Sequence, residues 1–341
     1  MLGTILLAML GTDAMTQERP LDPTPIVIAH RGASGSRPEH TLAAYALAIE
    51  QGADFIEPDL VLTRDDVFVV RHENEISGTT DVAAHPEFAA RRTTKTIDGR
   101  QVTGWFTEDF TLAELRTLRA KERLPQLRPA NTAYDGQQPI PTLAEVIALA
   151  RRATAETGRT IGIYPETKHP TYFASIGQPM EARLVAELRE AGWDDAAAPV
   201  FIQSFEVNNL KALKKLTGIR LIQLMDGQGG PADHAVDSYA TMATPDGLTA
   251  VARYAWGIGP NKAMVGADKP LVRAAHAAGL RVHPWTYRAE NAFLPEAYRV
   301  AGGPQVHGRM GQEIADAVAA GVDGFFTDFP LIGMRIRNRP D

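Results

Sequence analysis

The 341-residue sequence contains no cysteine. Disulfide bonds, zinc–thiolate sites and a thiol nucleophile are therefore excluded, as is lipid attachment at a cysteine. The absence leaves the cellular compartment open, because cysteine-free chains occur both inside and outside the cytoplasm.

Dense runs of lysine or arginine are also missing. The chain has 35 basic and 41 acidic residues and a formal net charge of -6, whereas nucleic-acid-binding proteins usually carry a basic patch. The nearest cluster, Lys211, Lys214 and Lys215, is interpreted as the solvated face of an amphipathic helix. The charge pattern thus argues against a nucleic-acid partner.

No apolar run is long enough to form a transmembrane helix, so stable membrane insertion is not expected. The N-terminal stretch MLGTILLAMLGTDAM is apolar like the centre of a signal peptide, but no Lys or Arg precedes the apolar residues. We interpret residues 1–25 as a degenerate or truncated secretion signal. An artefactual or cytoplasmic N-terminus is the alternative.

What the sequence does contain is a regular alternation of strand-like and helix-like segments, which predicts a parallel sheet with crossover helices. The predicted strands are 26–30, 54–60, 160–166, 200–205, 220–225, 255–259, 280–286 and 324–327. The predicted helices are 41–51, 143–153, 180–191, 207–216, 270–278 and 312–320. Eight such strands are the pattern of a TIM (β/α)8 barrel, although periodicity alone leaves a doubly wound open sheet possible.

The region from Glu73 to Pro141 departs from this alternation, because it holds Gly, Pro and polar clusters and one clear helix. A structureless loop of this length is unusual in a compact domain. We therefore predict one domain over residues 26–335 with an inserted subdomain at about 73–141, after the second strand. The motif TLAE at Thr111 and again at Thr142 predicts two helix capping boxes. The insertion offers no catalytic candidate, so we expect it to govern access and not chemistry.

Carboxylates and a lysine stand at the predicted strand ends. Glu57 and Asp59 are two residues apart, so in a strand they face the same side and can present oxygens to one cation. Glu166 and Lys168 repeat this spacing in TIGIYPETK. Three carboxylates suit a hard divalent cation, and the lysine suits an anionic substrate held beside it. Structural ion pairs are the alternative.

Two histidines, His30 and His72, end the apolar runs PIVIAH and VFVVRH. Imidazole changes charge near neutral pH, which makes the pair a candidate for acid–base catalysis. Buried structural histidines are the alternative. Asp328 is interpreted as a turn cap, and His40 as part of the turn before the first helix. The other histidines, His169 included, have no partner spacing that distinguishes them.

In sequence these segments resemble the glycerophosphodiester phosphodiesterase family, in particular its bacterial periplasmic members, from about Ile26 to Pro330. The resemblance is carried in order by HRGASG, PEHT, IEPDL, GIYPETK, GIGP, VHPWTYR and GFFTDFP. It implies a TIM barrel with the insertion described above. Together with the N-terminal stretch it implies a periplasmic enzyme, with the cytoplasm as the alternative.

The resemblance also implies an activity, the hydrolysis of small-molecule glycerophosphodiesters such as glycerophosphocholine and glycerophosphoethanolamine to sn-glycerol 3-phosphate and an alcohol. It implies general acid–base roles for His30 and His72. It implies one divalent cation, Ca²⁺ ranked before Mg²⁺, on the three carboxylates. Two rival interpretations remain: a phospholipase C-like phosphodiesterase acting on intact lipids or other diesters, and a non-catalytic barrel that binds a ligand.

Four further residues are candidates for substrate contact. The resemblance implies phosphate contact by Arg31, for which pairing with a surface carboxylate is the alternative. Lys168 is expected to neutralise a phosphoryl oxygen. Gln203 is expected to hydrogen-bond near the site and Trp285 to pack against glycerol, with core packing as the alternative for both. Family members commonly have Asp where this chain has Glu73, which leaves the orientation of the preceding histidine open.

Overall fold

The computed structural model describes residues 24–266 and 268–338. Most of the expected secretion signal falls on residues 1–23, which lie outside this range. Among the described residues, no helix is long and apolar enough to cross a membrane.

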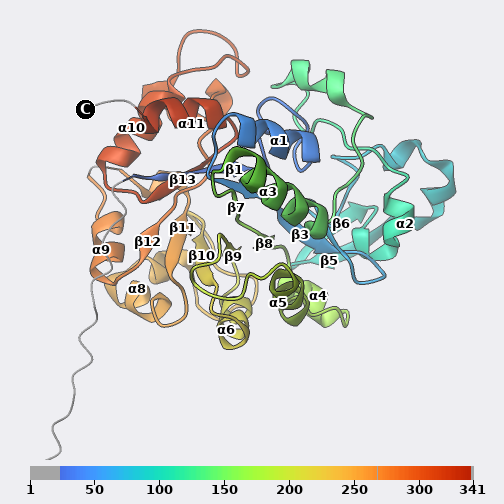
Figure 1. The fold of residues 1–341 in the computed structure, drawn as a ribbon, viewed down its shortest axis with the longest axis horizontal. Helices are drawn as coiled ribbons and strands as arrows, with labels where there is room; N and C mark the ends of the chain where they lie inside the picture. Colours follow the sequence, from blue (N-terminus) through green and yellow to red (C-terminus); the bar gives the residue numbers. More distant parts are fainter. Residues whose placement is uncertain (1–23, 267, 339–341) are drawn as a thin grey trace, which may run out of the picture.

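Within the described residues, eight strand positions form the barrel (Figure 1). In chain order they are β1 (Ile26–His30), β2 (Phe55–Glu57) with β3 (Asp59–Leu62), β7 (Gly162–Ile163) with β8 (Glu166–Thr167), β9 (Phe201–Ser204), β10 (Arg220–Met225), β11 (Gly257–Pro260), β12 (Arg281–Val282) and β13 (Gly324–Thr327). Neighbouring barrel strands are parallel, and β13 returns to pair with β1. Backbone hydrogen bonds from Phe326 to Pro284 and from Asp323 to Val282 join β13 to the β12 segment. The predicted TIM barrel is confirmed.

The second and third strands, predicted as unbroken runs, are each interrupted at a proline. Pro58 separates β2 from β3, and Pro165 lies between β7 and β8. Proline has no N–H to donate to the ladder, so it interrupts regular pairing. As a result β2 pairs with β7, whereas β3 pairs with β8. The two breaks lie directly beside the carboxylates Glu57, Asp59 and Glu166.

Helices surround the barrel (Figure 1). They are α1 (Leu42–Glu50), α3 (Leu143–Thr157), α4 (Pro170–Ser175), α5 (Glu181–Glu190), α6 (Val207–Leu216), α7 (Tyr239–Met242), α8 (Pro245–Val251), α9 (Leu271–Ala277), α10 (Met310–Ala319) and α11 (Pro330–Arg337). The predicted capping box at Thr142 opens α3, and Gly158 ends it at φ 69, a left-handed conformation that glycine adopts readily.

The barrel interior is filled by large apolar side chains. Tyr164 and Phe201 stack inside it with ring centroids 4.9 Å apart, and Phe326 meets the edge of Tyr164 at 5.0 Å. Ile28 and Ile222 complete this cluster. As in other barrels of this kind, the centre is a packed core and not a pore.

β4 (Phe68–Val70) follows β3 and pairs antiparallel with it, before the insertion begins. Figure 1 shows the insertion gathered on one side of the barrel. Its strands are β5 (Thr93–Ile97) and β6 (Arg100–Gly104), which form a hairpin, and they are followed by α2 (Leu112–Leu115). The predicted capping box at Thr111 is present at α2. Asp98 and Gly99 form the hairpin turn with φ values of 47 and 76, as a two-residue type I′ turn requires.

Candidate active site

The candidate site residues lie at the carboxyl ends of the barrel strands, where TIM-barrel enzymes have their active sites. Strand register places His30 opposite Glu57, and Asp59 opposite Glu166. A cavity of about 1200 Å³ opens there, between the barrel, the β5–β6 hairpin and the loop after β10. All the residues predicted for the site line this cavity except Asp59, which is buried beside them.

The three carboxylates form one buried cluster. One oxygen each from Glu57, Asp59 and Glu166 lie within 4.8 Å of one another. Burial raises the pKa of Glu57 and of Glu166, and the negative charge of Asp59 raises both further, although Lys168 opposes the rise at Glu166. Asp59 Oδ1 is buried and has no hydrogen-bond partner among the residues that the structure describes. A divalent cation fits this cluster, because it accepts oxygen ligands, relieves the repulsion and satisfies the orphaned oxygen.

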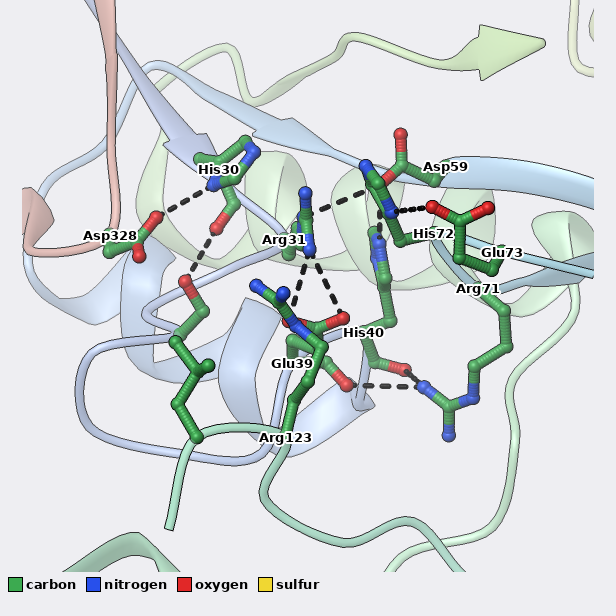
Figure 2. A network of polar contacts seen from close by, with 12 residues as sticks. His30, Arg31, Glu39, His40, Asp59, Arg71, His72, Glu73, Arg123 and Asp328 are labelled. Atoms are coloured by element: carbon green, nitrogen blue, oxygen red, sulfur yellow. Dashed lines mark hydrogen bonds and ion pairs between the residues drawn. The ribbon is translucent and has the colours of Figure 1, made fainter. Parts of the chain in front are cut away.

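Each candidate catalytic histidine has a carboxylate partner of its own. His30 Nδ1 lies 2.6 Å from Asp328 Oδ1, and His72 Nδ1 lies 2.8 Å from Glu73 Oε1. In Figure 2, Arg31 stands between the two rings and each carboxylate lies on the outer side. Burial, followed by the charge of Arg31, lowers the pKa of both histidines to about 3. A neutral ring carries its proton on Nδ1 toward the carboxylate, so Nε2 has a lone pair that can accept a proton, and in His72 this nitrogen lies 3.4 Å from Lys168 Nζ.

The interpretation of Asp328 as a turn cap is wrong. Besides His30, its carboxylate accepts a hydrogen bond from Arg288 Nε at 3.0 Å and another from Arg128. Asp328 and His30 are 298 residues apart in sequence. They meet because β13 closes the barrel beside β1, which no local pattern reports.

Arg31 and Lys168 place positive charge beside the carboxylate cluster. Arg31 Nη1 donates to both oxygens of Glu39, at 3.2 and 3.1 Å, and Arg31 Nε lies 3.5 Å from Asp59 Oδ2. This arginine is buried, so pairing with a surface carboxylate does not describe it. Lys168 Nζ lies 2.8 Å from Glu166 Oε1 and 3.4 Å from His72 Nε2. An anionic group entering the cavity meets both cations.

Gln203 and His40 orient the carboxylates. Gln203 Nε2 donates to Glu57 Oε1 at 3.1 Å, and its own Oε1 is buried with no partner within residues 24–266 and 268–338. His40 Nε2 lies 2.8 Å from Asp59 Oδ2, so it holds a carboxylate and stands outside the cluster of possible ligands. Trp285 lines the cavity, its Nε1 donates to Gly259 and its ring contacts Phe205, so it packs within the structure, and its contact with glycerol stays a prediction.

The insertion does more than flank the cavity. Arg123 Nε donates to Glu39 Oε2 at 2.7 Å, and Glu39 in turn holds Arg31. Arg128, buried with a side chain 3% exposed, pairs with Asp328, the partner of His30. The insertion therefore supports catalytic candidates through their partners, which the sequence analysis missed. No local signal marks these arginines, because their partners lie 84 and 200 residues away.

His169 was also missed. Its Nε2 lies 2.9 Å from Glu73 Oε2, and its Nδ1 lies 2.6 Å from Asp98 Oδ2 in the hairpin turn. Burial lowers its pKa, as does the charge of Lys168, but the hydrogen bonds to Asp98 and Glu73 outweigh both and raise the pKa to about 9. At neutral pH the ring is therefore a cation that donates from both nitrogens.

This raised pKa predicts a pH-dependent contribution to stability. The folded-state pKa of His169 exceeds the unfolded value of 6.5, so its contribution is full below pH 6.5 and is lost as pH rises through about 9. Replacing His169 by Asn should therefore lower the free energy of unfolding more at pH 6 than at pH 9.5. Urea unfolding at both pH values measures this, and an equal loss at the two contradicts it. His234→Asn is the control, because His234 has the same φ of 51 and an exposed side chain.

A barrel with a carboxylate cluster that could hold a metal ion, two carboxylate-paired histidines and two positively charged side chains at one cavity has residues suited to phosphoryl transfer. Residues 30–332 match the sequence profile of the glycerophosphoryl diester phosphodiesterase family. The chain belongs to this family and is an enzyme of the phosphodiesterase class.

Curated relatives agree with the family. A glycerophosphodiester phosphodiesterase of Arabidopsis thaliana is 36% identical over 92% of this chain and 86% of its own length. One from Haemophilus influenzae is 31% identical over 91% and 88%. Among solved structures, an Oleispira antarctica phosphodiesterase in complex with its product sn-glycerol-3-phosphate is 21% identical, with a TM-score of 0.64 over 93% of this chain and 98% of that one. The structural likeness supports the fold.

Proposed function

We propose that this protein hydrolyses glycerophosphodiesters such as glycerophosphocholine and glycerophosphoethanolamine to sn-glycerol 3-phosphate and the free alcohol, with the help of one divalent cation. One observation carries the proposal: the carboxylate cluster, the positively charged side chains of Arg31 and Lys168, and two carboxylate-paired histidines lie together at one cavity. The glycerol phosphate product held by the Oleispira relative supports this substrate class.

The cation would be held by Glu57, Asp59 and Glu166, with Ca²⁺ ranked before Mg²⁺. When bound, such an ion polarises a phosphoryl oxygen and lowers the pKa of a hydroxyl beside it. The contacts of Gln203 with Glu57 and of His40 with Asp59 fix two of the carboxylates in place. Fixed carboxylates favour binding, because less side-chain freedom is lost.

His30 and His72 would carry the protons. One imidazole accepts, at Nε2, the proton of the attacking hydroxyl or water. The other imidazole must first take up a second proton from solvent at Nε2, and its carboxylate partner stabilises the charged ring. As the bond between phosphorus and the alcohol oxygen breaks, this ring donates its Nε2 proton to the leaving alkoxide and becomes neutral. Arg31 and Lys168 offset the negative charge that gathers on the phosphoryl oxygens, and both are already oriented by buried carboxylates.

Release of sn-glycerol 3-phosphate from glycerophosphocholine, followed with and without EDTA, tests the proposal. We expect release that EDTA abolishes and that added Ca²⁺ or Mg²⁺ restores. Bis(p-nitrophenyl) phosphate, which has no glycerol phosphate, should be a poor substrate. Failure to release glycerol phosphate would overturn the substrate assignment, and full activity in EDTA would overturn the metal.

The periplasmic location remains a prediction from the N-terminal apolar stretch and the family resemblance, with the cytoplasm as the alternative. Fractionation of cells that produce the full chain, followed by assay of each fraction, would decide between them.

A further inference from the structure

Four side chains form a continuous polar chain from the cavity to the insertion. His72 Nδ1 lies 2.8 Å from Glu73 Oε1, and the second oxygen of Glu73 lies 2.9 Å from His169 Nε2. The opposite nitrogen of His169 lies 2.6 Å from Asp98 Oδ2. Glu73 thus bridges two imidazoles with its two oxygens, and the chain ends on the hairpin turn of the insertion.

Glu73 is poorly restrained by the rest of the structure. Its side chain is 50% exposed, and for the described residues its hydrogen bonds run to these two histidines alone. A glutamate also has one more rotatable bond than an aspartate, and fixing it costs more conformational entropy. Without a second anchor, Glu73 would therefore hold His72 in its catalytic orientation for a smaller part of the time.

His169 and Asp98 are held in place by unusual backbone conformations. His169 has φ 51 between the end of β8 and Pro170, and Asp98 has φ 47 in the hairpin turn. Residues other than glycine rarely adopt positive φ, and they keep it where surrounding contacts favour it. Both side chains that meet here therefore come from residues with positive φ.

We infer that His169 is a positioning residue for His72, which acts through Glu73 and is itself anchored by Asp98 of the insertion. The inference rests on the proposed catalytic role of His72. It gives the β5–β6 hairpin a part in orienting the acid–base machinery in addition to lining the cavity.

Replacing His169 by Asn tests the inference, because Asn tolerates positive φ but cannot span Glu73 and Asp98. We expect kcat for glycerophosphocholine to fall about tenfold while KM changes less than about twofold, since misorientation of a catalytic group affects the reaction more than binding. The control is His85→Asn, which removes another histidine that lies between two carboxylates, Glu87 at 3.0 Å and Asp81 at 3.5 Å, but that does not line the cavity. This control should leave kcat unchanged.

A double-mutant cycle separates positioning from a merely structural role. If His169 acts through Glu73, the variant that combines His169→Asn with Glu73→Ala should be no slower than Glu73→Ala alone. A further tenfold loss on the Glu73→Ala background would overturn the inference. The assays are run below the melting temperature of each variant, so that loss of folded enzyme does not enter the comparison.

The contact between His169 and Asp98, in the hairpin turn, has its own test. Asp98→Gly removes the carboxylate but keeps a residue that type I′ turns favour, and Asp98→Asn keeps a neutral acceptor there. We expect kcat to decrease from wild type to Asp98→Asn to Asp98→Gly, by about threefold overall, and equal values would contradict the anchoring role. If the wild type releases no glycerol phosphate, the proposed function is wrong, and if His72→Ala remains active, the catalytic role of His72 on which this inference rests is wrong. If His72→Ala is inactive and His169→Asn is normal, only this inference fails.

Discussion

Alanine in place of His30 or His72 should lower kcat for glycerophosphocholine by about 10²- to 10⁴-fold each, the range for loss of one general acid or base. Each ring sits between a carboxylate at Nδ1 and the cavity, and the methyl group of alanine cannot transfer a proton there. Binding should change less, because Arg31 and Lys168 remain. Steady-state kinetics on purified variants measures both effects.

The folding of both variants must be checked, because His30 is buried and His72 is partly buried. A thermal melt and circular dichroism should show folded protein. His85→Ala is the control, since His85 lies in the insertion with exposed carboxylate partners and does not line the cavity. A folded His30→Ala or His72→Ala enzyme that keeps more than about a tenth of the wild-type kcat would remove that residue from the catalytic pair.

Glu57→Gln should abolish tight binding of the cation and lower kcat by about 10³-fold, which corresponds to about 4 kcal/mol of transition-state stabilisation. Glu57 suits this test because its side chain accepts hydrogen bonds only from the Arg31 backbone and Gln203, among the described residues. A neutral amide of the same shape can keep an acceptor there. Titration calorimetry with Ca²⁺ and with Mg²⁺ measures the affinity directly.

Thermal melts give this prediction a readout independent of activity. Added Ca²⁺ should raise the melting temperature of the wild type, because a ligand that binds only the folded state stabilises it, and should leave Glu57→Gln unchanged. In EDTA the variant should melt at or above the wild type, since one of three mutually repelling carboxylates is gone. Equal stabilisation of both proteins by Ca²⁺ would place the cation elsewhere.

Much of the barrel and the inner site could be read from local sequence. Strand ends are marked by apolar runs that stop at His30 or Glu166, and a two-residue spacing puts Glu57 and Asp59 on one side. These patterns involve residues within a few positions of one another, so they can be recognised without a structure. Even here the breaks at Pro58 and Pro165 were missed, although proline in a strand is a local signal.

The partners of the site were decided by tertiary structure. Asp328 reaches His30 across 298 residues, and Arg128 reaches Asp328 across 200, only because the barrel closes and the insertion folds back onto it. Glu73 and His72 are neighbours in sequence and contact each other, but the second oxygen of Glu73 is fixed by His169, 96 residues away. By itself the sequence determined which chemical groups stand at the strand ends, because strand periodicity is a local property. Which carboxylate orients which histidine depends on the closure of the barrel and on the insertion folding back onto it. Both bring together residues that share no local sequence pattern.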